Sequence, residues 1–435
     1  MLKAGFARVD VTPQLGVYMS GKFNDRYAKG ILDPLQLNAL ALFDGNETQL
    51  IIIADFIGVD CKFCDRIRRK IARRTSLDET HIMLSALHQH TAICIGAREE
   101  NRDESVLNDP VYMENLYRKY CDVAQMALDD MSEAHLGFGM EETAEPIAFI
   151  RRYLLKDGTV MGHPVGRTHE IVRRIGEGDN RVRLLRFVRE GKNDVAFVNF
   201  CTHPDVISGE LFSADWPGFV RRYVEKDLEG VSCLLLNGVQ GDSNHCDYLA
   251  DEVKWGYAHS AYMGRTIADV VVKLWEHTAS VTDTRLGCAR QDLYLRTRTD
   301  EVERYDECKE ILDATNERRI PRPTGAVLGN AGRVVRLRTS PVFQKVPLSA
   351  MRIGTICIVG YGGEPFTGYA AAIERAHPEL TLLTSCCCNG YEGYLPTKEI
   401  LCESGYEASS SPFEADLEEK CHNAAMELID QLWQD

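Results

Sequence analysis

Residues 82–91 read Ile-Met-Leu-Ser-Ala-Leu-His-Gln-His-Thr, an apolar run that ends in two histidines, His88 and His90. The run predicts a buried strand. Residues i and i+2 of an extended chain point to the same face, so both imidazoles are expected on one side. Such a pair can share a metal ion, or one ring can bind the metal while the other acts as a base. Hydrogen-bonded loop histidines would give the same short pattern.

Other predicted strands end in similar side chains. The runs are followed by His203 after residues 198–202, by Asp242 and Asn244 after 234–238, by Glu364 after 358–363, and by Tyr394 beyond 382–384. Active sites are common at such ends, because a rigid sheet holds convergent loops in register. On spacing alone the pattern is consistent with a zinc enzyme, and each residue taken singly is also consistent with a structural role.

The remaining periodicity predicts a mixed protein. Helices are expected from Asp109-Pro110 and from the capping box Ser411-Pro412-Phe413-Glu414. Buried strands are expected at residues 49–54, 82–84, 195–200, 231–236, 354–359 and 380–383, and the alternating run 333–338 predicts a half-exposed strand. Helices and strands mixed in this way favour a layered α/β or α+β architecture. The polar stretch 301–325 is either a domain boundary or an excursion within one domain.

Composition excludes several classes of protein. The 435 residues are 44% hydrophobic and carry a net charge of -15, which argues against a nucleic-acid or anionic-membrane surface. We see no membrane span and no export signal, so the expected location is the cytoplasm. The cysteine count is 15, an odd number that suits reduced thiols. Cys61 and Cys64 form a C-x-x-C pair, which we interpret as two buried residues on one helical turn.

Several motifs, taken in order, resemble the neutral/alkaline (non-lysosomal) ceramidase N-terminal domain family. They are Gly5-Phe6-Ala7-Arg8-Val9-Asp10-Val11-Thr12-Pro13, Gly30-Ile31-Leu32-Asp33-Pro34-Leu35, Ile51-Ile52-Ile53-Ala54-Asp55, residues 84–91, Phe200-Cys201-Thr202-His203-Pro204, Ser213-Ala214-Asp215-Trp216-Pro217-Gly218, Gly363-Glu364-Pro365-Phe366, Gly393-Tyr394-Leu395-Pro396-Thr397 and Gly405-Tyr406-Glu407. The resemblance runs from about residue 5 to about residue 410. It implies a four-layer αββα sandwich and one large catalytic domain over residues 1–435, without the family's further immunoglobulin-like domain.

The resemblance also implies a single zinc ion and a role for each site residue. The implied ligands are His88, His203, Glu364 and Tyr394. His90 would be an acid/base group beside the metal, Tyr406 would hydrogen-bond the reacting carbonyl, and Arg151 would bind substrate. Such a ligand set leaves the metal room to activate water, and a phenol and an arginine can stabilise an oxyanion.

Three departures from the family bear on the substrate. Asn244 stands where the ceramidases have a serine proposed as essential, so a serine-mediated step is in doubt and Asn244 is expected to act as a hydrogen-bond donor. The export signal is missing. The charged segment 98–104, in place of Ser-Gly-Pro, is either a solvated loop or a polar lid. Ceramide is therefore a less favoured substrate than a small polar molecule.

The sequence thus predicts a zinc-dependent hydrolase that cleaves an amide, or an ester or lactone, in a small polar substrate by attack of zinc-bound hydroxide. A lyase or isomerase acting on a sugar-acid-like substrate is the first alternative, and a non-catalytic binding module on the same fold is the second. A homo-oligomer stays open, because the apolar helices can pack internally or across a two-fold axis.

Overall fold

Alternating side chains along the central strands face two different cores. In β3 (Gln36–Phe43), Leu40 and Leu42 belong to one buried cluster, whereas Ala39 and Ala41 belong to another. Successive side chains of a strand point to opposite faces of its sheet, so this strand is covered on both sides. The computed structural model describes residues 1–22, 24–96, 104–403 and 405–434; most of the predicted lid at 98–104 therefore lies outside the described residues.

The strand β3 lies inside a large, mostly antiparallel sheet. Its strands follow the order β16 (Val231–Asn237), β14 (Asp194–Phe200), β13 (Arg181–Arg189), β8 (Ser132–Glu142), β1 (Lys3–Asp10), β3, β4 (Thr48–Ala54) and β6 (Ile82–Ala86), and β18 (Ala279–Ser280) pairs with β8. The pairs β4–β6 and β14–β16 are parallel. The carboxyl ends of each parallel pair therefore lie at the same edge of the sheet.

A second sheet packs on one face of the first. It consists of β19 (Leu286–Arg296), β20 (Phe343–Ile353), β21 (Ile356–Tyr361) and β23 (Thr381–Ser385), with β21 and β23 parallel. Met351, Ile353 and Ile358 join Leu40 and Leu42 in one buried cluster between the two sheets.

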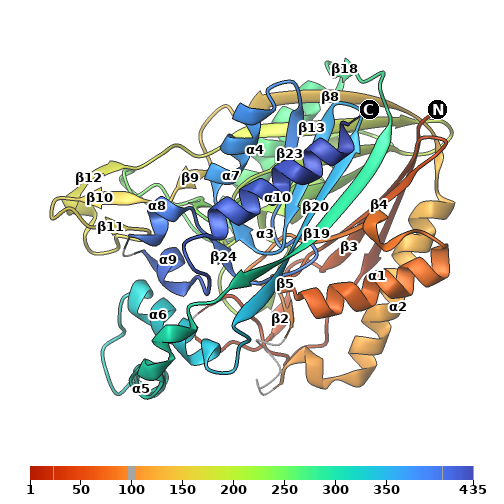
Figure 1. Cartoon of the computed structure of the whole chain (residues 1–435). Coiled ribbons are helices and arrows are strands. Elements are labelled where there is room, and N and C mark those ends of the chain that lie inside the picture. The colour runs from red at the N-terminus through yellow and green to blue at the C-terminus, as the bar shows by residue number, and fades with distance from the viewer. Residues whose placement is uncertain (23, 97–103, 404, 435) are drawn as a thin grey trace.

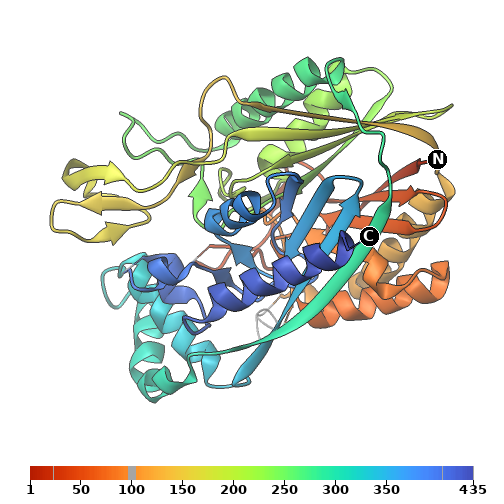
Figure 2. The same ribbon diagram turned by 45° about the horizontal axis from the view of Figure 1, so that its top comes forward.

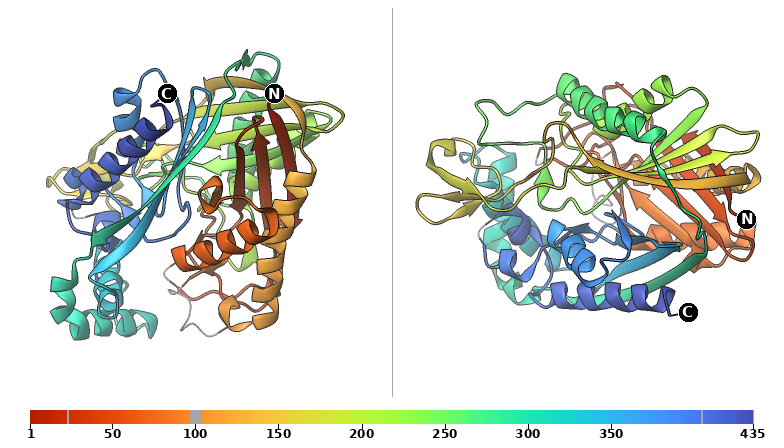
Figure 3. Two further views of the ribbon diagram at one scale, coloured as in Figure 1. Left: turned by 45° about the vertical axis from the view of Figure 1, so that its right-hand side comes forward. Right: turned by 90° about the horizontal axis from the view of Figure 1, so that it is seen from above.

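Helices cover the two outer faces. The large sheet carries α2 (Pro110–Asp129), α3 (Asp215–Asp227) and α4 (Tyr257–Trp275), with α1 (Cys61–Thr75) against α2, and the small sheet carries α7 (Thr367–Ala376) and α10 (Leu417–Leu432). Figure 2 and the right-hand view of Figure 3 show the order of layers, with α3 and α4 on one side, α10 on the other and both sheets between them. The expected α/β class and αββα layering are confirmed.

Two segments project beyond the sandwich (Figure 1). One is a small sheet of β10 (Tyr153–Leu155), β11 (Val160–Met161) and β12 (Ile171–Arg174). The other is an excursion between β19 and β20, which contains η5 (Thr299–Arg304), α5 (Tyr305–Asn316) and α6 (Gly325–Leu337). The excursion interpretation of residues 301–325 agrees with this position, between two paired strands.

Short strands and helices complete the chain. They are β2 (Gly30–Ile31), β5 (Gly58–Val59), η1 (Glu79–His81), β7 (Cys94–Ile95), η3 (Val106–Asn108), β9 (Phe149–Ile150), η4 (Thr168–Glu170), β15 (Leu211–Phe212), β17 (Ser243–Asn244), β22 (Glu364–Pro365), β24 (Tyr394–Leu395), α8 (Lys398–Leu401) and α9 (Tyr406–Ser410). Among the described helices, none combines the length and the apolar character needed to cross a bilayer.

Two element predictions are wrong. Residues 333–338 form the end of α6, not a strand, because Arg333, Val334 and Leu337 follow a helical period and Thr324 caps the helix through its hydroxyl. The last helix begins at Leu417, whereas the capping box predicted a start near Ser411. Phe413 pairs instead with Thr297 in a β-bridge, which keeps this segment extended. Cys61 and Cys64 lie in the first turn of α1 as expected, but only Cys64 is fully buried.

Candidate metal centre

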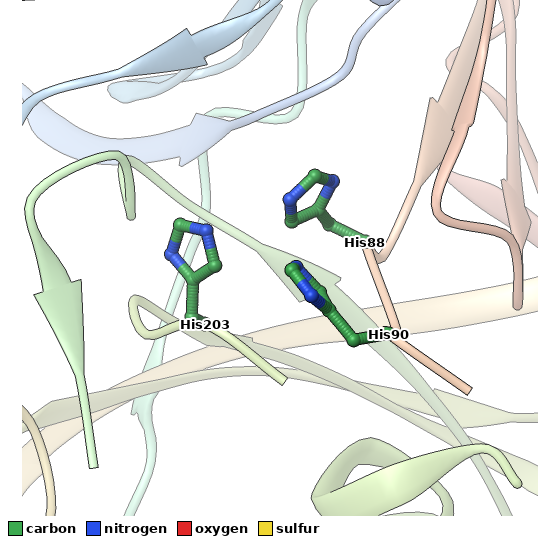
Figure 4. A group of neighbouring side chains, drawn as sticks. All are labelled: His88, His90 and His203. Carbon is green, nitrogen blue, oxygen red and sulfur yellow. The ribbon is translucent and has the colours of Figure 1, made fainter. Parts of the chain in front are cut away.

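Three histidine rings converge where the large sheet meets the small one. Ligand atoms of His88, His90 and His203 all lie within 4.8 Å of one another. Figure 4 shows the rings facing a common point, with His88 and His90 on the segment after β6 and His203 on the segment after β14. The sequence prediction that these strand ends meet is therefore confirmed by the geometry.

The prediction that His88 and His90 converge because the chain is extended is wrong. Strand β6 ends at Ala86, and His88 has φ 76°, in the left-handed region that non-glycine residues rarely adopt. The intervening Gln89 is buried and donates to Asp55, whose carboxylate also accepts two hydrogen bonds from Arg221. This buried ion pair holds the middle of the turn and so presents both histidines to the same side.

In each histidine ring, a hydrogen bond to a backbone carbonyl fixes which nitrogen carries the proton. The Nδ1 atoms of His88, His90 and His203 lie 2.6, 2.7 and 2.7 Å from the carbonyl oxygens of Ile57, Gly21 and Gln240, respectively. A carbonyl oxygen only accepts, so each Nδ1 is protonated and each Nε2 carries a lone pair. This is the tautomer in which an imidazole binds a metal through Nε2.

Glu364 places a carboxylate opposite two of these lone pairs. Its Oε2 lies 3.3 Å from Nε2 of His88 and 3.2 Å from Nε2 of His203. The oxygen is buried and has no hydrogen-bond partner among the described residues. Three acceptors facing one another repel unless a ring proton or a metal ion lies between them. In a tetrahedral site with bonds of about 2.0 Å, neighbouring ligand atoms are about 3.3 Å apart, so these distances fit a zinc ion.

The charges around the centre favour that arrangement. Burial opposes ionisation of Glu364, but His88 and His203 outweigh it and hold its pKa well below the usual range. Burial and the charge of Arg151 lower the pKa of His203 to about 4. Burial, with help from His88, also holds the pKa of His90 well below its usual range. The histidines thus favour the ionised form of the carboxylate, and burial favours the neutral form of the His90 and His203 rings.

Tyr394, a predicted ligand, and Arg151, a predicted substrate-binding residue, lie together beside His203. Tyr394 lies on β24, which pairs with β22 so that Tyr394 faces Glu364 across the ladder. Its hydroxyl accepts from Nη2 of Arg151 at 3.2 Å, and the same Nη2 lies 3.3 Å from Nε2 of His203. The Nε of Arg151 lies 3.1 Å from Glu407. Tyr394 and Arg151 are therefore brought to the centre, although Glu407 was not singled out in the sequence.

Tyr406 and Asn244 are placed differently from each other. The Tyr406 ring lies 5.9 Å from the ring of Tyr394 and lines the cavity that contains His88, His90 and Glu364. Asn244 is fully buried on β17, its side-chain oxygen accepts from the backbone of Cys246, and it does not line that cavity. Tyr406 therefore borders the cavity at the centre, whereas Asn244 is buried outside that cavity. The donor role of Asn244 stays a prediction.

The cavity above the centre has a volume of about 1080 Å³. Its walls include Arg151 and Tyr394 from the site, Met161 and His163 from the β10–β12 projection, and residues 322–326 at the start of α6. Residues from these projections were not predicted to reach the site, because neither carries a motif that connects it to the histidine cluster. Small-molecule sites commonly have about this size.

Comparison with solved structures shows which known fold this chain shares. No protein-family model matches the chain, and no curated protein matches it in sequence. The structure is similar to the neutral ceramidase from Pseudomonas aeruginosa, with a TM-score of 0.74 and 13% sequence identity over 99% of this chain and 75% of that chain. It is also similar to a ceramidase complexed with C2, with a TM-score of 0.71 and 12% identity over 99% of this chain and 76% of that one. The chain has a neutral-ceramidase-like fold.

Proposed function

We propose that this protein, built on a neutral-ceramidase-like fold, is a zinc-dependent hydrolase that cleaves the C–N amide bond of a small polar substrate. The observation that carries the proposal is the convergence of buried acceptors: Nε2 of His88 and of His203 face Oε2 of Glu364 at 3.3 and 3.2 Å. Oε2 of Glu364 has no hydrogen-bond partner among the described residues, and a buried acceptor without a donor is costly, which supports an ion at this place.

Zinc is the ion that this donor set suits. Two neutral imidazoles and one carboxylate, with a phenol nearby, are borderline ligands, and calcium or magnesium would need more oxygen atoms. When bound, zinc would act as a Lewis acid and lower the pKa of a water molecule bound to it to near neutrality. The ligands would be His88, His203, Glu364 and Tyr394.

The surrounding residues can perform the proton transfers and charge stabilisation of amide hydrolysis. Nε2 of His90 has no partner among the described residues, so this neutral ring can take a proton from the attacking water and pass it to the leaving amine. An amine leaves poorly without that proton, which is why an amide is favoured over an ester or a lactone. Arg151 and Tyr406 border the same cavity and can stabilise negative charge on the carbonyl oxygen.

Metal content is the first test. Protein purified without added metal should contain about one zinc per chain by elemental analysis, and His88→Ala and His203→Ala should each lose it. His169→Ala is the matched control, because that side chain is 75% exposed and does not line the cavity. Circular dichroism should first show that the wild-type protein is folded. A negligible metal content in that folded protein would contradict the proposal.

Product mass is the second test. Hydrolysis adds one water to the substrate, whereas isomerisation leaves its mass unchanged and elimination of water lowers it. A panel of short N-acyl amides, esters and lactones, followed by mass spectrometry, should give products that sum to substrate plus water. Activity that persists after complete removal of zinc by a chelator would exclude the metal-dependent reaction.

A further inference from the structure

One short segment, residues 213–216 at the start of α3, contacts both segments that carry the histidines. The first of these contacts is with residues 88–91. The backbone N–H of Ser213 donates to the carbonyl of Thr91 at 3.1 Å, and the hydroxyl of Thr91 donates to the carbonyl of Ser213 at 3.0 Å. These two reciprocal hydrogen bonds fix the chain just after His90 against the start of the helix.

The second contact is with residues 203–207. Nε1 of Trp216 donates to the backbone carbonyl of His203 at 3.4 Å. The carboxylate of Asp215 accepts from the backbone N–H of Ile207, which lies 3.1 Å from its Oδ2. Residues 213–216 therefore bridge the two segments from which the metal centre is built, and we refer to these four residues as the bridge.

The carboxylate of Asp215 joins three parts of the fold. While Oδ2 accepts from Ile207, Oδ1 accepts from the hydroxyl of Ser260 at 2.6 Å and from the backbone N–H of Trp216 at 2.7 Å. Ser260 lies on α4 and Trp216 on α3. One fully buried side chain thus ties two helices to the segment that follows His203.

Helix capping does not account for these contacts. The capping position of α3 is occupied by Ala214, and no side chain makes a capping hydrogen bond there. Two of the three hydrogen bonds that the Asp215 carboxylate accepts come from outside α3, from Ile207 and Ser260. The carboxylate therefore serves the surroundings of the helix more than the helix itself.

Asp215 is also held at a cost. Its φ is 49°, in the left-handed region that non-glycine residues rarely adopt. Burial raises the pKa of its carboxyl, because the hydrogen bonds from hydroxyl and backbone groups offset only part of the lost hydration. Residues held in such conformations persist where the surrounding structure fixes them, and they cluster at functional sites. Here both costs fall on the residue that contacts the His203 segment.

We propose that Asp215 is a positioning residue of the metal centre, which holds His203 at the separation from His88 that a zinc ion requires. Zinc sites need ligand distances within about 0.2 Å of ideal values, so a small shift of residues 203–207 weakens binding. Asp215 does not line the cavity above the centre, so it acts through His203. This inference rests on the metal centre of the proposed function, but not on the reaction proposed there.

Metal affinity tests this role without any substrate. The full-length protein is stripped with a chelator, then titrated with zinc against a chromophoric chelator and with cobalt, whose visible absorption reports coordination geometry. Asp215→Asn keeps the shape of the side chain but has one acceptor oxygen in place of two. Its zinc affinity should fall about 10–100-fold, and its cobalt spectrum should differ from that of the wild type. Trp216→Phe, which removes the donor to His203, should change both readouts in the same direction.

A loss of stability alone should not have this effect. Asp179→Asn removes a carboxylate that pairs with two arginines away from the cavity, so it should leave zinc affinity and the cobalt spectrum unchanged. Circular dichroism checks that each variant is folded. If Asp215→Asn does not fold, Ser260→Ala and Trp216→Phe carry the test, because each removes one hydrogen bond of the bridge. An equal loss of affinity in Asp179→Asn would overturn the positioning role.

The outcomes also separate this role from the proposed reaction. If the bridge variants bind zinc less tightly than the wild type and no amide is cleaved, the positioning role stands and the proposed reaction fails. If amides are cleaved but the variants match the wild type in zinc affinity and cobalt spectrum, the positioning role is overturned and the proposed function stands. A folded wild-type protein that binds neither metal would overturn both.

Discussion

The Nε atom of Arg151 lies 3.1 Å from a carboxylate oxygen of Glu407, and both side chains are more than nine-tenths buried. Burial opposes the charge of Arg151, but Tyr394 and Glu407 outweigh it and raise its pKa. For Glu407, burial outweighs the nearby guanidinium of Arg151, so the pKa of this carboxyl is raised. The pair therefore fixes Arg151 beside His203 and Tyr394 at the expense of burying a carboxylate.

Breaking this pair should destabilise the protein strongly. Glu407→Ala leaves the Arg151 charge buried without its carboxylate, and we expect a loss of about 3–5 kcal/mol in the free energy of unfolding. The double variant Arg151→Ala/Glu407→Ala should lose less than the sum of the single variants, measured by urea denaturation. Glu310→Ala removes one of the two carboxylate partners of the exposed Arg319 and should cost less than about 1 kcal/mol. Additive effects at the buried pair would contradict this coupling.

His90 should be needed for turnover but not for metal. Its Nε2 is part of the histidine cluster, yet the predicted ligands are His88, His203, Glu364 and Tyr394. Loss of a general acid/base typically lowers the rate 10²–10⁴-fold, so His90→Ala should reduce kcat by about that factor and keep about one zinc per chain. The readouts are elemental analysis and steady-state kinetics on the same preparation. Metal loss equal to that of His88→Ala would make His90 a ligand instead.

Gly329→Ala should disturb Tyr406 through packing. The added methyl group would lie 2.9 Å from the tyrosine ring, so the ring or the helix must shift. We expect kcat to fall about tenfold while the protein stays folded. Gly332→Ala lies on the same helix with nothing within 4 Å of the new Cβ atom, and it should gain about 0.5–1 kcal/mol from helix propensity without changing kcat. Equal kinetics in the two variants would show that Tyr406 tolerates the displacement.

Asp179 should give a pH-dependent contribution to stability. Burial opposes its charge, but Arg181 and Arg183 lower its pKa to about 2, against about 3.9 in an unfolded chain. A depressed folded-state pKa stabilises the protein above the unfolded value, and the contribution is lost as the pH falls from about 4 toward 2. It amounts to about 2–3 kcal/mol at pH 7.

The variant Asp179→Asn isolates this contribution. It should be less stable than wild type at pH 7, and the difference should narrow below pH 4, measured by thermal and urea denaturation. Glu145→Gln, at an exposed position, is the control and should follow the wild-type curve. A difference that stays constant from pH 7 to pH 2.5 would mean that shape, not charge, is what Asp179 contributes.

The sequence predicted the convergence of strand ends but not its local causes. Apolar runs before His88, His203 and Glu364 are long enough to identify buried strands, and buried parallel strands place their ends together. The left-handed backbone of His88 depends on the contact between Gln89 and Asp55, which lie in two separate motifs and whose contact no sequence pattern reveals. The short alternating run 333–338 fits both a strand and a helix, and the cap at Thr324, nine residues before the run, starts the helix that contains it.

The excursion between β19 and β20 has a bearing on how substrate preference can diverge. The two strands pair as neighbours up to Arg296 and Phe343, so the excursion begins and ends at residues that face each other across the ladder. A hairpin connection of this kind can be lengthened, shortened or exchanged without changing the register of the sheets. The cavity-lining residues 322–326 lie on this segment, whereas His88, His203 and Glu364 follow strands of the two sheets. Descendants of such a protein could therefore change what they recognise while keeping the same chemistry.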